Sequence, residues 1–256
     1  MNNKFVASIV VCTIYLLLII VGQKLQVGAG NISLNDLASK QILIAPVVGL
    51  IFLTVVTLVS GWSREIGIVP PRTLKSVSLA WLPALFIVCF FLLGAVIGFP
   101  PEQTLLFIGV NTLLVGITEE MGFRGILLNG AASRFRLPAA IAFASVAFGA
   151  VHALNGFITE EFLFSAAQAV SAAMGAVLFT ALLLRSGSII PGMIVHWLWD
   201  FGIFVFTAGR PEDANVTPAS SALLLMGPLL FDLPGFLYGL WLLRGIGKRT
   251  KEEMVG

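Results

Sequence analysis

The sequence predicts an all-α protein, a polytopic membrane bundle of about eight transmembrane helices. Its composition is the first observation behind this prediction. Of the 256 residues, 58% are apolar and only 11% are charged, whereas soluble domains average about 45–50% apolar and about 25% charged residues. With a mean hydropathy of +0.99, the chain has too few charges to cover a water-facing surface. We therefore expect the lipid bilayer to be its solvent.

The second observation is the spacing of the apolar segments. A bilayer core requires roughly 20 residues per helix, and the chain offers eight candidate spans separated by hydrophilic joints: 5–21, 41–60, 77–99, 104–128, 138–154, 162–184, 189–207 and 221–243. The joint at 28–40 is long enough for a short interfacial helix, with Asn31 or Ser33 as its N-cap. We treat residues 1–256 as a single domain with a motif-bearing core at 104–207.

The basic residues predict the orientation of the bundle. With the N-terminus inside, the inner joints hold eleven of them: Lys4, Arg64, Arg72, Lys75, Arg134, Arg136, Arg185, Arg244, Lys248, Arg249 and Lys251. The outer joints hold three: Lys24, Lys40 and Arg210. Cytoplasmic joints carry an excess of Lys and Arg, so both termini are expected to be cytoplasmic. The first apolar run is expected to be a retained span and not a cleaved signal peptide.

Ionisable residues inside the spans are the candidates for function, because each costs at least about 2.5–3.5 kcal/mol to insert at mid-bilayer. The first group lies in the fourth span. Glu120 and Arg124 are four residues apart and share a helix face, so they can pair. Glu119 is turned about 100° away. The Glu120 carboxylate can therefore be neutralised by Arg124, while the Glu119 carboxylate is free to take part in catalysis. The alternative is a purely structural ion-pair network that includes Arg134 and Arg136.

Two further polar groups lie on the fifth and seventh spans. Phe148 and His152 are one turn apart on an apolar helix, and His196 is four residues before Asp200. A carboxylate commonly orients an imidazole in this way. Taken alone, His152 is explained by a satisfied core histidine, and the His196 pair by a polar contact between helices. Together the three groups include both histidines of the chain. One polar cavity shared by all three groups explains their presence inside the membrane better than three unrelated polar contacts, each with its own cost of insertion.

Three other residues inside spans are expected to play no part in chemistry. Cys12 and Cys89 lie in apolar runs and are interpreted as small core residues. Asp232, the remaining acid inside a span, is interpreted as a helix-end residue near the outer surface.

The three polar groups, in this order, resemble the CPBP family of CAAX proteases and bacteriocin-processing enzymes. The family pattern is EExxxR, then FxxxH, then HxxxN or HxxxD on successive membrane helices. Here it reads Glu119-Glu120-Met-Gly-Phe-Arg124, Phe148-Gly-Ala-Val-His152 and His196-Trp-Leu-Trp-Asp200. The resemblance implies an intramembrane endopeptidase in a prokaryotic cell membrane. Asp200 stands where CAAX-processing members carry Asn, which weakens the inference of a prenylated CAAX substrate.

The residues also suggest how a peptide bond would be hydrolysed. No serine or cysteine is paired with a base, so direct attack by water is expected. In this hypothesis Glu119 is the general base and His152 helps to hold or deprotonate the water. His196 and Asp200 steady the tetrahedral intermediate. Structural support of the site is expected from Glu120, Arg124 and Phe148, and the resemblance implies the same roles for the matching residues.

The cofactor and the function class leave alternatives. Zinc, if present, would be held by Glu119, His152 and His196, but the chain has no HExxH motif, and we favour hydrolysis without an obligatory metal. The expected partners are the bilayer and a peptide or protein substrate near the membrane, and nothing indicates nucleic-acid binding. The rival interpretation is a non-catalytic bacteriocin-immunity or membrane scaffold protein of the same fold. A carrier is disfavoured because no inverted repeat is found.

Overall fold

The computed structural model describes residues 3–28, 32–208 and 218–246, and this part of the chain contains helices but no strand. The helices that cross the bundle are α1 (Asn3–Val27), α3 (Ile44–Val59), α5 (Trp81–Ile97), α6 (Glu102–Glu119), α8 (Leu137–His152), α10 (Phe162–Ser186), α11 (Ile190–Ala208) and α12 (Pro218–Leu243). Short elements extend or connect them: α2 (Leu34–Ser39), α4 (Leu74–Val77), η1 (Ser78–Ala80), η2 (Glu120–Leu127), α7 (Leu128–Ala132), η3 (Ala153–Asn155) and α9 (Gly156–Thr159). The prediction of an all-α membrane bundle is confirmed.

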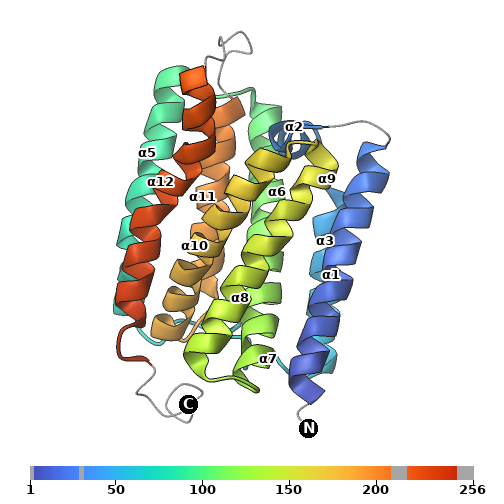
Figure 1. Ribbon diagram of the computed structural model, residues 1–256, viewed down its shortest axis with the longest axis vertical. Helices are drawn as coiled ribbons and strands as arrows, with labels where there is room; N and C mark the ends of the chain where they lie inside the picture. Colours follow the sequence, from blue (N-terminus) through green and yellow to red (C-terminus); the bar gives the residue numbers. More distant parts are fainter. Residues whose placement is uncertain (1–2, 29–31, 209–217, 247–256) are drawn as a thin grey trace.

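The crossings run alternately up and down through the bundle (Figure 1). Within the described residues, six helical stretches are long and apolar enough to cross a membrane, and two shorter apolar helices, Ile44–Val59 and Leu229–Leu243, accompany them. The start of α1 and the end of α12 lie at the same end of the bundle, together with the turns that follow α3, α7 and α10 (Figure 1). This arrangement agrees with about eight expected spans.

The outward face of the bundle is apolar. Large side chains such as Leu17, Val55, Val96, Val146 and Leu163 are between 52% and 85% exposed. A continuous apolar exterior of this kind suits lipid and would be a liability in water. The chain is therefore an integral membrane protein.

A short helix covers one end of the bundle. α2 lies across the upper end in Figure 1, and its N-cap is Ser33, whose hydroxyl accepts a hydrogen bond from the Asp36 amide. Asn111 of α6 fastens the following segment, since its Nδ2 donates to the carbonyls of Ala38 and Gln41 at 2.8 and 2.7 Å. The expected interfacial helix within 28–40 is confirmed with Ser33 as its cap, and the other candidate cap, Asn31, lies outside the described residues.

One helical crossing forms the centre of the molecule. α6, η2 and α7 are continuous over Glu102–Ala132, and η2 is a π-helix. π-Helical turns are rare and occur often at functional sites. Gly116 of α6 allows α11 to approach closely, because a Cβ there would lie 3.0 Å from the backbone nitrogen of Trp197. Gly149 does the same between α8 and α10, where a Cβ would lie 2.4 Å from the carbonyl oxygen of Ala169.

Two interpretations made from the sequence are wrong. Cys89 is exposed on the outside of the bundle and is not a core residue, whereas Cys12 is buried. Asp232 does not lie at a helix end, because α12 continues for several turns on both sides of it. Its carboxylate accepts a hydrogen bond from the Ser171 hydroxyl of α10. A polar partner on the facing helix is therefore what makes this acid tolerable inside an apolar span.

Candidate active site

Three crossings bring four of the predicted site residues together. Glu119 comes from the end of α6, His152 from the end of α8, and His196 and Asp200 from α11. The Oε2 atom of Glu119 lies 4.0 Å from Nε2 of His152 and 3.7 Å from Nε2 of His196. Nε2 of His196 lies 3.5 Å from Oδ2 of Asp200. Residues up to 81 positions apart in the sequence therefore share one site, as the three motifs predict.

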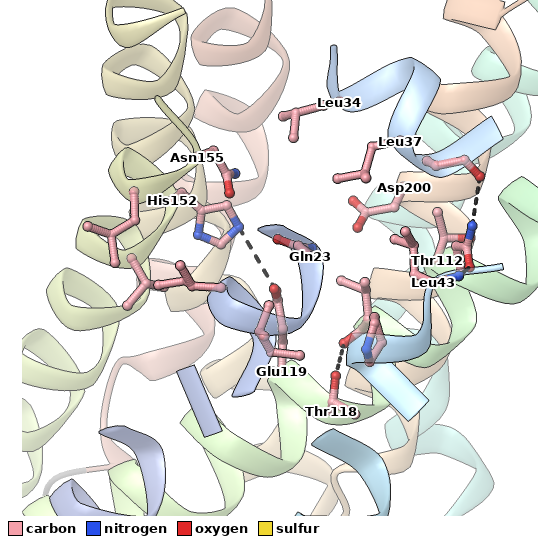
Figure 2. Close-up of a pocket in the computed structure, with 18 of the residues that line it drawn as sticks. Gln23, Leu34, Leu37, Leu43, Thr112, Thr118, Glu119, His152, Asn155 and Asp200 are labelled. Atoms are coloured by element: carbon pink, nitrogen blue, oxygen red, sulfur yellow. Dashed lines mark hydrogen bonds and ion pairs between the residues drawn. The ribbon is translucent and has the colours of Figure 1, made fainter. Parts of the chain in front are cut away.

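The Glu119 side chain reaches into a cavity, where it faces His152 across a short gap (Figure 2). The side chain is 20% exposed, yet its Oε2 atom is buried and accepts no hydrogen bond from the described residues. A buried carboxylate oxygen without a partner is costly. The atom therefore has acceptor capacity that the described residues do not use.

The hydrogen bonds of His152 determine which ring nitrogen faces the cavity. Its Nδ1 lies 2.8 Å from the backbone carbonyl oxygen of Phe148. A carbonyl oxygen only accepts hydrogen bonds, so Nδ1 carries the proton. In the neutral imidazole Nε2 is then the unprotonated nitrogen, and this is the atom that faces Glu119. The Phe148 ring packs edge-on against the imidazole with centroids 4.6 Å apart, which holds the ring in this orientation.

His196 is oriented by a second carboxylate. Its Nδ1 donates to Oε1 of Glu120 at 2.9 Å, so its Nε2 faces Glu119 and Asp200. Phe179 of α10 stacks on the imidazole, with centroids 4.9 Å apart and an interplanar angle of 12°. The ring of His196 is thereby fixed both at one edge and on one face.

Glu120 and Arg124 form a sealed ion pair below the site. Their side chains are 1% and 2% exposed, and Oε1 of Glu120 lies 3.1 Å from Nη1 of the Arg124 guanidinium. The guanidinium also lies over the Phe148 ring at 3.9 Å and near the Phe179 ring at 5.1 Å, an arrangement that stabilises a desolvated cation. The predicted pairing of these two residues is therefore observed.

The cavity above Glu119 has a volume of about 150 Å³. A cavity of this size has room for several water molecules. Its walls come from α1, α2, α3, α6, α8, α10 and α11. Leu34 and Leu37 of α2 project over its upper end, and Gln23, Asn155 and Asp200 supply polar groups around it (Figure 2).

The residues that could hold a metal ion are few. The described residues contain no group of three or more His, Cys, Asp or Glu side chains placed to hold a metal ion. For the residues expected to hold zinc, Oε2 of Glu119 lies 4.0 Å from Nε2 of His152 and 3.7 Å from Nε2 of His196.

One family of known proteins matches the central part of the chain. Residues 101–202 match the model of the Rce1-like family, type II CAAX prenyl endopeptidases. The matched segment begins just before α6 and ends two residues after Asp200, so it holds all four converging side chains. This confirms the resemblance found in the three motifs and supports a CAAX-type intramembrane protease at the family level. No curated protein and no solved structure gives a significant match.

Sequence reasoning missed some contributors to the site. Phe179 stacks on His196 and lies beside Arg124, but it stands in an apolar helix where nothing distinguishes it from neighbouring lipid-facing or core residues. Tyr15 of α1 lines the cavity and donates a hydrogen bond to Thr118 at 3.0 Å. A tyrosine within the first apolar span was a signal that could have been used, because a buried hydroxyl usually finds a partner.

Proposed function

We propose that this protein is an intramembrane endopeptidase that hydrolyses a peptide bond near the membrane with a water molecule activated by Glu119 and His152. One observation carries the proposal. Nε2 of His152 lies 4.0 Å and Nε2 of His196 lies 3.7 Å from Oε2 of Glu119, and Glu119 and His152 line one cavity. A base and a second nitrogen acceptor thus face the same small volume, and a potential donor lies directly beside the base.

The separations suit a water held between the side chains. Both distances from Glu119 Oε2 exceed a direct hydrogen bond, while a single water can contact Glu119 and His152 together. Glu119 would take a proton from this water as its oxygen attacks the scissile carbonyl. His152, with its unprotonated Nε2 towards the cavity, would hold the second hydrogen of the water.

The oxyanion of the tetrahedral intermediate needs a donor. When protonated, His196 presents Nε2–H towards Glu119 and Asp200, which line the cavity, while Glu120 holds the other edge of the ring in place. A preoriented donor of this kind stabilises charge as it develops. Glu119 then returns its proton to the leaving amine as the carbon–nitrogen bond breaks, which completes hydrolysis.

Glu120, Arg124, Phe148 and Phe179 would position the catalytic side chains without touching substrate. Buried ion pairs fix geometry more than they add stability. Their sealed position below the cavity is consistent with that role. We also propose that the protein resides in a prokaryotic cell membrane with both termini cytoplasmic, since the basic joints gather at one end of the bundle.

The test uses purified protein reconstituted in liposomes with a library of membrane-anchored peptides, and cleavage is measured by mass spectrometry. Wild type is expected to cleave a subset of the library, and Glu119→Ala and His152→Ala to lose that cleavage. Unchanged cleavage in both variants would overturn the mechanism. A phenotype in cells without any cleavage would favour an immunity or scaffold role instead.

Metal dependence is tested on the same preparation. The proposal predicts that activity survives titration with a strong chelator. Loss of activity followed by recovery on addition of zinc would contradict the metal-free mechanism.

A further inference from the structure

Two amide side chains on the wall of the cavity form a pair. Asn155 of η3 and Gln168 of α10 both line the cavity, and Nδ2 of Asn155 donates a hydrogen bond to Oε1 of Gln168 at 2.9 Å. A side-chain amide has two donor hydrogens and an acceptor oxygen. The bond therefore leaves Oδ1 of Asn155 as an acceptor and Nε2 of Gln168 as a donor, and neither atom has a hydrogen-bond partner among the described residues.

The pair lies close to the groups proposed to hold the water. Asn155 follows His152 by three residues, so the two side chains share a helix face, and Figure 2 shows Asn155 directly above His152 at the cavity. Three residues advance about 4.5–6 Å along a helix axis. An extended chain covers that length in about one to two residues. The amide pair is therefore placed to meet a substrate residue one or two positions from the bond that is cut.

One acceptor and one donor side by side match the main chain of a single extended residue. In a strand the N–H and C=O of one residue point to the same side, and in an antiparallel pair the opposite residue bonds to both. Oδ1 of Asn155 can accept from that N–H while Nε2 of Gln168 donates to that C=O. Apolar side chains such as Leu16, Ile19 and Val151 line other parts of the cavity and suit apolar side chains of a bound segment.

We propose that Asn155 and Gln168 bind the main chain of one extended substrate residue, one or two positions from the scissile bond, and so align that bond with Glu119. This inference rests on the proposed endopeptidase function and names two substrate-binding residues for it. Main-chain hydrogen bonds supply affinity without a requirement for particular side chains. Binding to Asn155 therefore requires an N–H at that substrate residue, whatever its side chain is.

The experiment replaces single N–H groups of a substrate. One membrane-anchored peptide that wild type cleaves is resynthesised with an α-hydroxy acid at each position near the cut in turn, so that an ester oxygen replaces one N–H. The position whose nitrogen belongs to the scissile bond is left unchanged. We measure kcat/KM in proteoliposomes, and mass spectrometry verifies the cleavage position. One ester, one or two residues from the cut, is expected to lower kcat/KM roughly tenfold, the effect of one lost hydrogen bond.

Variants identify the protein group that contacts this N–H. Asn155→Leu removes the acceptor, so the ratio of kcat/KM for the parent peptide to that for the sensitive ester should fall from roughly tenfold to about one. Gln168→Met removes the partner that holds Asn155 and should also lower the ratio. Gln103→Leu, which replaces an exposed amide of α6, should keep it. Because each variant is compared with itself, a general loss of rate does not affect the ratio.

The outcomes separate this inference from the proposed function. If wild type cleaves every ester within two residues of the cut as fast as the parent peptide, the inference is overturned and the endopeptidase stands. A ratio that stays at the wild-type value in Asn155→Leu has the same meaning. If Asn155→Leu is not recovered as folded protein, the ratio in Gln168→Met decides in the same way. Cleavage of no peptide by wild type overturns the endopeptidase and the inference with it.

Discussion

Two consecutive glutamates of the central helix occupy opposite environments. Glu119 has a side chain that is 20% exposed to the cavity, and its buried Oε2 accepts no hydrogen bond from the described residues. Glu120 is 1% exposed, paired with Arg124 and hydrogen-bonded by His196. The Oε2 atom of each carboxylate is buried without a hydrogen-bond partner among the described residues. The difference is that Glu119 lies beside a cavity, whereas Glu120 is neutralised by Arg124 away from it.

The difference shows how two adjacent residues of a helix can take a catalytic and a structural role. Successive residues point about 100° apart, so Glu119 faces α8 and the cavity while Glu120 faces α11 and Arg124. His196 connects the two, because its Nδ1 contacts Glu120 and its Nε2 faces Glu119. Substitutions at the first glutamate should therefore affect rate, and those at the second should affect stability and rate together.

The largest expected effect comes from Glu119→Gln. The amide keeps the shape of the side chain but cannot take a proton from water, so kcat should fall by about 10²–10⁴-fold. The melting temperature in detergent should remain that of wild type. Glu102→Gln, at the exposed start of the same helix, is the matched control and should keep full activity. Activity near wild type in Glu119→Gln would remove this residue from the mechanism.

Arg124→Met should have the next largest effect, and on stability. It leaves Glu120 buried without its cation, which costs about 3–5 kcal/mol in comparable pairs. Thermal unfolding in detergent measures the loss. Arg134→Gln, at an exposed position beyond α7, should leave the melting temperature unchanged. A stable Arg124→Met protein would show that the ion pair does not hold the site together.

The sequence was sufficient to predict which polar residues meet in the site, because the free-energy cost of inserting ionisable side chains into a bilayer is large. Six ionisable side chains inside apolar helices, on three spans, can be tolerated only where they meet each other. The spacing of four residues in Glu120–Arg124 and His196–Asp200 then specifies which of them share a face. Both pairs are observed, at 3.1 and 3.5 Å.

Phe179→Leu should have a moderate effect on rate. Loss of the stacked ring frees the face of His196, and kcat should fall by about tenfold, or about 1.4 kcal/mol, with KM unchanged. Phe179→Tyr keeps the ring and should restore kcat. Steady-state kinetics on one cleaved peptide measure both. Equal kcat in all three proteins would mean that the hydrogen bond that His196 donates to Glu120 is sufficient to orient the ring.

Asp232→Asn should have the smallest effect. The amide can still bond to Ser171 across the α10–α12 contact, so stability should change by no more than about 1 kcal/mol and activity by less than about twofold. The same thermal and kinetic assays apply. A loss as large as that of Glu119→Gln would make Asp232 part of the catalytic machinery.

The features that could not be predicted from the sequence depend on backbone geometry or on contacts between helices that are distant in the chain. Nothing in 120–127 marks a π-helix, because a shift of backbone hydrogen bonds by one residue leaves no trace in composition. Phe179 is one aromatic residue among many apolar ones, and its role arises only from the side chain opposite. Asp232 was misplaced for the same reason, since its partner Ser171 belongs to another span.

The central claim is that Glu119 and His152 act on the same water, and a double-mutant cycle tests it most directly. The kcat/KM values of Glu119→Gln, His152→Ala and the double variant are compared with wild type. Residues that act as one unit are strongly non-additive, so the double variant is expected to be no more than a few-fold slower than the slower single variant. Losses that multiply would show independent roles and contradict the account.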